Sequence, residues 1–302
     1  MADLVVSPQP RPLGRSGILV SPIAWGMWRF AGVSPAEGRA LIEAVLAAGV
    51  TLFDTADIYG FNGASGFGDA ESLLGTILTE TPGLREQMVL ATKGGITPPV
   101  PYDSSRDYLM AALDASLRRL RVEQVELYQI HRPDLLTHPQ ELARTLEAMV
   151  TSGKVRAIGV SNFTLEQTRA LASVLTVPLA SQQPEFSPLH TAPMTEGLFD
   201  LAMSKDIATL AWSPLGGGRI AQPQTEREHA VAAALDTVAA KFGVSRTAAA
   251  YGWITAHPAR VIPIAGTQNP ARIAELPDAF EVRWTRQDWY DVLVAARGER
   301  LP

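Results

Sequence analysis

The sequence predicts an α/β fold, an eight-stranded (β/α)8 TIM barrel with an N-terminal β-hairpin and extra helices near the C-terminus. Short apolar runs alternate with helical patterns along the chain, and eight of these runs stop at a polar or glycine residue. Strands that alternate with helices are typical of a parallel sheet. In a closed barrel of such units, the carboxyl ends of all strands face one opening, where the chemistry takes place. We therefore expect the polar residues that follow the runs to lie close together.

In the first half of the chain, each expected strand leads into an expected helix. Residues 13–20 predict a tight hairpin, because glycines stand at its turn. Pro35 suits the first turn of a helix and Gly49 suits its end. The expected strands cover about 22–26, 50–53, 88–92 and 125–130, and the expected helices 36–48, 70–80, 105–120 and 139–150.

In the second half the alternation of strands and helices continues, but more helices are expected than four strand–helix units need. Thr164 is expected to cap one helix and Thr285 another. The segment 213–260 is long enough for a glycine-rich loop and two helices, 228–241 and 245–256. The remaining strands are expected at about 155–159, 179–182, 207–211 and 261–264, and the remaining helices at 164–172, 195–204, near 269–270 and 285–297.

Composition restricts the class of protein. The 302 residues are 46% hydrophobic, which suffices for one large core, and no polar linker divides the chain, so we expect a single domain over residues 1–302. The net charge of −5 without a basic patch disfavours nucleic acid as a partner. No apolar run approaches the length that spans a membrane, and no signal peptide is evident, so a cytoplasmic location is expected.

Metal and thiol chemistry are not expected either. The chain has no cysteine, which excludes disulfides and thiolate catalysis, and its five histidines show no paired ligand spacing.

Four residues at or beside the ends of the second, third and fourth strands have complementary chemistry: Asp54, Tyr59, Lys93 and His131. A tyrosine phenol has a pKa near ~10, and a nearby ammonium group is expected to lower it towards neutrality. A carboxylate would keep the lysine charged, and a neutral histidine could orient a substrate oxygen. Together they predict a proton donor aimed at a carbonyl, and none of the four can supply a hydride, so reduction would need a cofactor.

Six motifs in order carry a resemblance to a known family. They are LGRSG at 13–17, FDTADIYG at 53–60, ATK at 91–93, IHRPD at 130–134, GKVRAIGVSNF at 153–163 and WSPL at 212–215. With these motifs the chain resembles the aldo-keto reductase family over residues 13–276. The HRPD motif and the later Gly-Gly-Gly-Arg are similar to those of a bacterial oxidoreductase subgroup.

The resemblance implies a barrel that binds a nicotinamide dinucleotide without a Rossmann domain, and the sequence indeed has no Gly-x-Gly-x-x-Gly motif. It implies that Tyr59 is the general acid in carbonyl reduction, that Lys93 and Asp54 tune it, and that His131 orients the carbonyl. The function implied is the NAD(P)H-dependent reduction of an aldehyde or ketone to an alcohol.

The resemblance also assigns residues to the coenzyme. Ser161, Asn162 and Gln183 would bind the nicotinamide carboxamide, and Trp212 would stack on the ring. Ser213, Leu215, Gly218 and Arg219 would cover the pyrophosphate. The adenosine end would lie against Gly266, Thr267, Gln268, Arg272 and Glu275.

The family's usual coenzyme is NADPH, and we expect it here, with NADH possible. Ile264 stands where many members have lysine, and Gln268 or Asn269 stands where a basic residue often contacts the 2′-phosphate. Because charge-assisted contacts to phosphate are the strong ones, fewer cations should weaken the preference for NADPH.

A small carbonyl compound is the expected partner, with Trp28 lining the pocket beside Tyr59 and His131. Phe61 and Tyr102 are further candidates, although both could simply pack on loops. Two other functions stay open: a barrel aldolase with Lys93 as a Schiff-base nucleophile, and a non-catalytic nucleotide-binding regulatory subunit. The sequence leaves the physiological substrate, the direction of reaction and the oligomeric state open.

Overall fold

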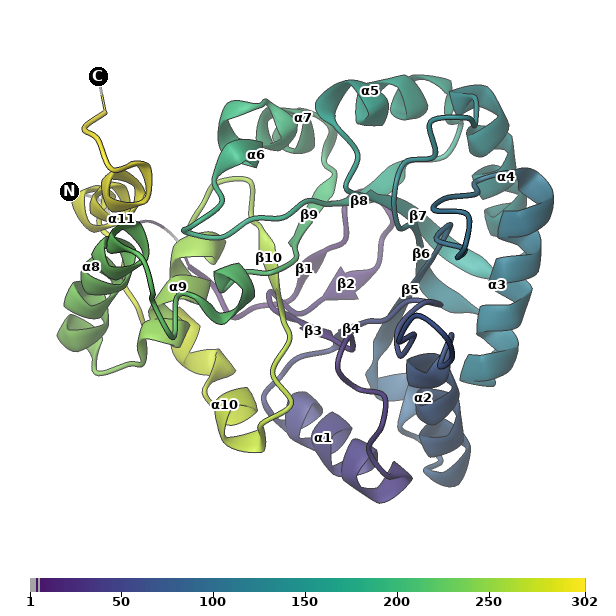
Figure 1. Ribbon diagram of the computed structural model, residues 1–302, viewed down its shortest axis with the longest axis horizontal. Coiled ribbons are helices and arrows are strands. Elements are labelled where there is room, and N and C mark those ends of the chain that lie inside the picture. Colours follow the sequence, from purple (N-terminus) through teal and green to yellow (C-terminus); the bar gives the residue numbers. More distant parts are fainter. Residues whose placement is uncertain (1–3, 5, 302) are drawn as a thin grey trace.

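The computed structural model describes residues 4 and 6–301, which form a closed barrel of eight parallel strands (Figure 1). Each strand pairs with its neighbours along the chain, and the last pairs with the first through Ile264 beside Ala24. The barrel strands are β3 (Ala24–Gly26), β4 (Leu52–Asp54), β5 (Val89–Gly94), β6 (Val125–Ile130), β7 (Val155–Ser161), β8 (Leu179–Gln183), β9 (Ala208–Ala211) and β10 (Ile262–Ala265). The predicted barrel and all eight of its strands are confirmed, and no strand end differs from the prediction by more than two residues.

Helices surround the barrel, as Figure 1 shows. The predicted caps at Thr164 and Thr285 are confirmed, since each side chain accepts a hydrogen bond from the first turn of its helix. The helices of the ring are α1 (Pro35–Ala47), α2 (Asp69–Glu80), α3 (Arg106–Leu120), α4 (Pro139–Thr151), α5 (Leu165–Val174), α6 (Ala192–Thr195), α7 (Leu198–Lys205), α9 (Arg246–Thr255) and α10 (Pro270–Ala274).

One predicted helix, 195–204, is wrong because the chain forms two, α6 and α7. Gly197 separates them with a φ of 83°, a left-handed conformation that ends one helix and begins the next. Three short 3₁₀ helices, Arg85–Gln87, Gly216–Gly218 and Leu276–Phe280, were not predicted.

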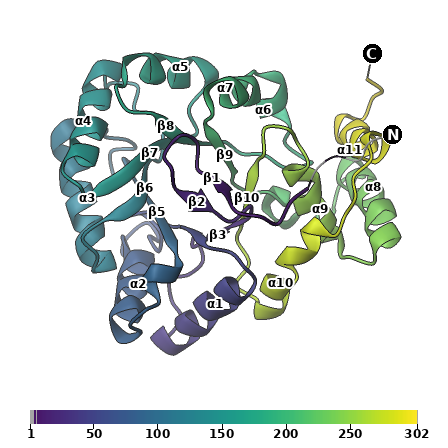
Figure 2. The same cartoon turned by 180° about the vertical axis from the view of Figure 1, so that it is seen from behind.

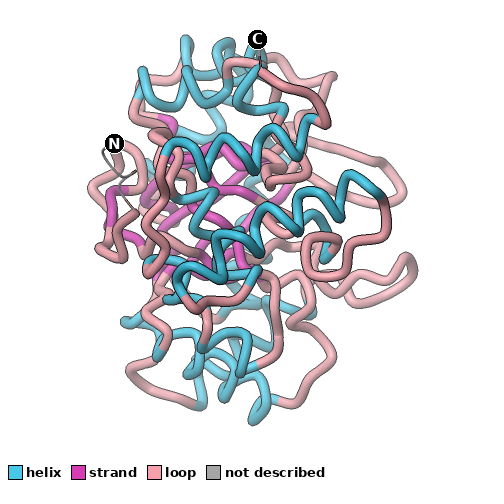
Figure 3. Tube along the Cα trace, turned by 90° about the vertical axis from the view of Figure 1, so that its left-hand side faces the viewer, coloured by secondary structure: helices cyan, strands magenta, loops and turns pink. Residues whose placement is uncertain are grey.

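Two extra helices, α8 (Glu226–Phe242) and α11 (Arg286–Arg297), pack together beside the barrel (Figures 1 and 3). Trp253 of α9 stacks on Trp289 of α11 with ring centroids 4.8 Å apart. Each indole N–H donates to the main-chain carbonyl of the other tryptophan at 3.0 Å. These buried aromatic contacts attach the extra helices to the ring.

The hairpin at the start of the chain covers the end of the barrel at which the strands begin (Figure 2). Its strands are β1 (Arg11–Pro12) and β2 (Leu19–Val20), so it is slightly wider than the predicted residues 13–20. Leu13 and Ile18 are buried against the apolar side chains inside the barrel. At Gly14, with a φ of 54°, a Cβ atom would approach the carbonyl oxygen of Ala180 to 2.4 Å. The hairpin therefore closes this end, and the open end is the one at which the strands finish.

Among the described residues, no helix is both long enough and apolar enough to cross a membrane.

Candidate active site

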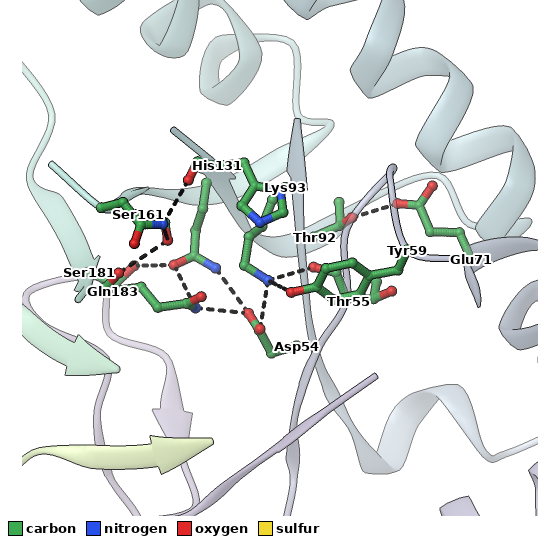
Figure 4. A network of polar contacts seen from close by, with 12 residues as sticks. Asp54, Thr55, Tyr59, Glu71, Thr92, Lys93, His131, Ser161, Ser181 and Gln183 are labelled. Atoms are coloured by element: carbon green, nitrogen blue, oxygen red, sulfur yellow. Dashed lines mark hydrogen bonds and ion pairs between the residues drawn. The ribbon is translucent and has the colours of Figure 1, made fainter. Parts of the chain in front are cut away.

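The four residues with complementary chemistry meet at the open end of the barrel (Figure 4). Asp54 is the last residue of β4, Lys93 lies in β5, Tyr59 lies in the loop after β4, and His131 follows β6. The Lys93 ammonium lies 2.6 Å from Asp54 Oδ2 and donates to the Tyr59 hydroxyl at 3.2 Å. It also donates to the carbonyl of Thr55 at 2.9 Å. The Lys93 side chain is 0% exposed, so these three groups are its environment.

Two amides hold the other oxygen of Asp54. Gln129 of β6 and Gln183 of β8 each donate an Nε2–H to Asp54 Oδ1 at 3.1 Å. Gln129 was not predicted from the sequence, although a polar residue two positions before His131 in an apolar strand was a usable signal. Gln183 was expected to bind the nicotinamide. One of its amide N–H groups already donates to Asp54 and so supports the ion pair between Asp54 and Lys93.

The aromatic rings of the site lie edge to face. The Tyr59 ring lies 5.8 Å from His131 and 5.2 Å from Trp28, with interplanar angles of 76° and 85°. Trp28 is 62% exposed and so lies at the mouth of the site. Phe61 instead packs against Phe67, with ring centroids 6.1 Å apart, which favours a loop-packing role for Phe61.

Burial sets the charge states of the site. Burial lowers the pKa of Lys93, but Asp54 and Tyr59 outweigh it, so the net pKa is raised and the lysine is an ammonium at neutral pH. Burial raises the pKa of Tyr59, and Lys93 offsets only part of that rise. The expected lowering of the phenol pKa is therefore not found. Burial, together with Lys93 and Arg132, places the pKa of His131 well below its usual value, which makes its imidazole neutral.

Three residues expected at the nicotinamide form one hydrogen-bonded chain next to the four. Asn162, with a φ of 61°, donates from Nδ2 to the carbonyl of His131 at 3.1 Å and to Ser161 Oγ at 2.8 Å. Its Oδ1 accepts the indole N–H of Trp212 at 2.9 Å. The guanidinium of Arg132 lies 5.9 Å from the centre of the Trp212 ring. These contacts fix the half-buried Trp212 ring at the open end of the barrel.

The loop after β9 has the conformation of a backbone cradle. Ser213 and the three glycines from Gly216 to Gly218 all have positive φ values. Arg219 donates from Nε to the carbonyl of Gly216 at 2.8 Å and pairs with Glu228 at 3.3 Å. The guanidinium is therefore held close to this loop, while about half of its side chain stays exposed.

The segment after β10 differs in part from expectation. Helix α10 has five residues, begins with Pro270, which has no N–H, and has the N–H of Ala271 capped by Asn269. Fewer N–H groups are thus available for a phosphate than the sequence suggested. Both polar side-chain atoms of Gln268 are buried without a partner among the described residues, and Arg272 and Glu275 are exposed. Gly266 and Thr267 lie between β10 and these residues, and the carbonyl of Thr267 accepts the indole N–H of Trp25.

A buried acidic cluster that was not predicted from the sequence contains Glu71 and Asp57. Glu71 accepts from Thr92 Oγ1 at 2.5 Å and pairs with Arg119 at 2.7 Å. Asp57 donates its main-chain N–H to the carbonyl of Lys93, but among the described residues both its carboxyl oxygens lack a partner. Burial, and then Glu71, raise the pKa of Asp57 well above its usual value. No pattern of spacing along the chain signals this cluster, because α2, α3 and β5 bring it together.

No group of three or more metal-binding side chains occurs within the described ranges. The Tyr59 phenol lies next to the neutral imidazole of His131 and the fixed ammonium group of Lys93.

Comparison with known proteins agrees with this geometry. The family model described as the aldo/keto reductase family matches residues 22–293. A protein named 6-dehydroglucose reductase from Novosphingobium aromaticivorans is 60% identical over 100% of both chains. A protein of the same name from Agrobacterium fabrum is 38% identical over 93% of this chain and 96% of its own.

The fold has a solved counterpart in the glycerol dehydrogenase of Gluconobacter oxydans. The two structures superpose with a TM-score of 0.83 at 28% identity, covering 99% of this chain and 98% of the other. From the family match, the full-length relatives and the shared barrel, we conclude that this chain belongs to the aldo-keto reductase family, the oxidoreductases of carbonyl compounds.

Proposed function

We propose that the protein reduces an aldehyde to an alcohol with NADPH and that Tyr59 is the general acid. The observation that carries this proposal is the buried Lys93, which contacts both Asp54 at 2.6 Å and the Tyr59 hydroxyl at 3.2 Å. A phenol that is hydrogen-bonded to a fixed ammonium group can release its proton to a substrate oxygen, because the ammonium stabilises the phenolate that remains.

The charge states support this direction of proton transfer. The raised pKa of Tyr59 keeps the phenol protonated at neutral pH, so the proton is present when the substrate arrives. The ammonium form of Lys93 then stabilises the developing phenolate, and Asp54 with its two amide partners keeps that ammonium in place. The neutral His131 can donate an N–H to the carbonyl oxygen without competing for the proton.

The coenzyme supplies the hydride when it is bound. The fit of the residues to a nicotinamide dinucleotide rests on two observations: the fixed Trp212 ring beside Asn162, and the unpartnered buried amide of Gln268. Ser161, Asn162 and Gln183 would hold the carboxamide, and Trp212 would lie against the ring. The pyrophosphate would lie by Ser213, Leu215, Gly218 and Arg219, and the adenosine by Gly266, Thr267, Gln268, Arg272 and Glu275.

The exposed Arg272 supports NADPH as the coenzyme, because its guanidinium is available to a 2′-phosphate. Since the start of α10 adds little to that contact, the preference over NADH should be modest.

We propose 6-dehydroglucose, a sugar with an aldehyde at its sixth carbon, as the substrate. The proposal is supported by the relative of that name, which is 60% identical over the whole chain. The exposed Trp28 beside Tyr59 offers a flat apolar face on which the C–H groups of a sugar ring can pack.

The test is the Tyr59→Phe variant, assayed for coenzyme oxidation with 6-dehydroglucose and with a simple aromatic aldehyde. Loss of the general acid should lower kcat by ~100- to 10,000-fold, while NADPH binding stays unchanged. Turnover of the variant near the wild-type rate would refute the acid role. A wild-type enzyme that reduces the aromatic aldehyde but not the sugar would refute only the substrate.

The two alternatives make different predictions for the same protein. An aldolase needs a neutral lysine as nucleophile, whereas the pKa of Lys93 is raised by Asp54 despite burial. A regulatory subunit would bind NADPH tightly and turn over neither aldehyde.

A further inference from the structure

A cavity lies away from Asp54, Tyr59, Lys93 and His131. It has a volume of about 520 Å³ and is bounded by the N-terminal segment, the end of α9 and the start of α11. The stretch from Thr255 to Arg260 leads into the beginning of β10, and Arg11 belongs to the hairpin that closes the barrel. The cavity is thus at the end of the barrel opposite Tyr59 and Lys93, and its size is within the range of small-molecule sites.

Positive charge dominates the polar lining of this cavity. Arg11, Arg260 and Arg286 line it, and none of the lining residues that the structure describes carries a carboxylate. Within the described ranges none of the three guanidinium groups has an ion-pair partner. Three cations gathered without a counter-charge repel one another unless an anion joins them.

Arg11 shows that the site is built into the fold. It is only 5% exposed, it donates from Nη1 to the carbonyl of Arg260 at 2.7 Å, and its Nε is buried without a described partner. Burial, and then the nearby Arg260, lower the pKa of Arg11 to about 10. A buried N–H donor without an acceptor costs free energy that a bound oxyanion would recover.

The remaining walls are aromatic or neutral. Trp289 and Tyr290 line one side, with ring centroids 5.3 Å apart. His257 is neutral at physiological pH, because burial lowers its pKa to about 4 even though Asp200 acts in the opposite direction. Its Nδ1 accepts the N–H of Ala259 at 3.1 Å, which leaves Nε2 as a donor. The lining therefore suits a ligand with an anionic group and a flat apolar body.

We infer that this cavity binds a small organic anion, in which a phosphate or carboxylate group lies between Arg11, Arg260 and Arg286 and an apolar body lies against Trp289 and Tyr290. Such a ligand would bind at a site separate from the catalytic one and independently of the reaction proposed above.

The test is calorimetric titration of the full chain with phenyl phosphate, benzoate and inorganic phosphate, each with and without NADPH. We expect phenyl phosphate or benzoate to bind more tightly than inorganic phosphate, and NADPH to leave that affinity unchanged. Whichever of the two aromatic probes binds more tightly identifies the anionic group.

Arg260→Gln and Arg286→Gln should each weaken the tighter probe by about tenfold, the effect of one lost charge-assisted contact. Both side chains are exposed, so neither change should unfold the protein, and Arg283→Gln, three residues before Arg286, is the matched control for lost charge. The inference would be overturned if no probe bound, if inorganic phosphate bound as tightly as the tighter aromatic probe, or if NADPH displaced that probe. An equal loss of affinity in Arg283→Gln would overturn it as well.

Discussion

Lys93 has no exposed side-chain surface, and the residues that surround it decide whether its charge is tolerated. A buried ion pair is costly to form but more costly to break, because the remaining partner stays buried without compensation. Asp54 would keep its two amide donors if the lysine were lost, yet it would lose its counter-ion. The residues proposed for catalysis therefore also bear on stability.

Lys93→Met should lower the free energy of unfolding by about 3–5 kcal/mol, the usual cost of removing one partner of a buried pair. Urea unfolding measures this loss. Lys154→Met is the control, because Lys154 pairs with Asp114 at the surface, with side-chain exposures of 37% and 39%, and should change stability by less than ~1 kcal/mol. Equal effects of the two substitutions would contradict the buried pairing.

The raised pKa of Asp57 predicts how the stability of the protein depends on pH. Its pKa is raised in the folded protein, so between the unfolded value near ~3.9 and the folded value the native state binds the extra proton. This contribution is complete below the unfolded pKa and is lost as pH rises through the folded pKa, at up to about 1.4 kcal/mol per pH unit.

Asp57→Asn should remove this loss of stability with rising pH. We expect the stability of the variant relative to the wild type to increase from pH 4 upwards and to level off once Asp57 ionises in the wild type. Urea midpoints across this range measure the difference. A difference that stays constant with pH would mean that Asp57 has an ordinary pKa.

The sequence predicted that Asp54, Tyr59, Lys93 and His131 lie close together, because the carboxyl ends of parallel strands meet at one opening. It could not predict the neighbouring groups that other strands and helices bring to the site. Gln129 is part of the site only because β6 lies next to β5, and the pKa of Asp57 is raised mainly by burial, which cannot be inferred from the sequence. The expectation that the pKa of Tyr59 is lowered was wrong for the same reason, because burial cannot be inferred from the spacing of residues along the chain.

At the level of elements, the helices were predicted well where a capping residue marks the start, as at Thr164 and Thr285. The division between α6 and α7 was missed because Gly197 has a left-handed conformation inside an otherwise helical pattern. The short 3₁₀ helices lack the repeated apolar spacing from which helices are inferred.

Helix α2 lies so close to α3 that glycine is required at their contact. A Cβ atom at Gly75 would come within 2.0 Å of the main-chain carbonyl oxygen of Arg119. At Gly38 of α1 the nearest atom is the end of the Ile77 side chain, at 2.8 Å, and this atom can move.

Gly75→Ala should therefore destabilise the protein by about 1–3 kcal/mol, the usual cost of overpacking. Gly38→Ala should cost less, because the end of the Ile77 side chain can move away, and the gain of up to about 1 kcal/mol in helix propensity then offsets the remaining contact. Thermal unfolding of both variants makes the comparison. A larger loss for Gly38→Ala would show that the two helices can separate freely.

At the level of the whole molecule, the coenzyme would bind across loops from several strands and should stabilise the folded barrel. At a concentration of 100 times Kd, a ligand specific for the native state adds about 2.7 kcal/mol. We expect a larger rise in Tm with NADPH than with equimolar NADH. In Arg272→Gln the two rises should become similar, and an unchanged difference would remove Arg272 from the 2′-phosphate site.

The barrel closes where β10 pairs with β3, which joins Ala265 to Trp25 across most of the chain. Contacts between residues so distant in sequence form slowly, because a very long loop must be ordered first. During synthesis, β3 therefore keeps one edge without hydrogen-bond partners until residues 262–265 have left the ribosome. Unpaired edges of this kind favour association with other chains, so the interval before closure is the stage at which this protein is most prone to aggregate.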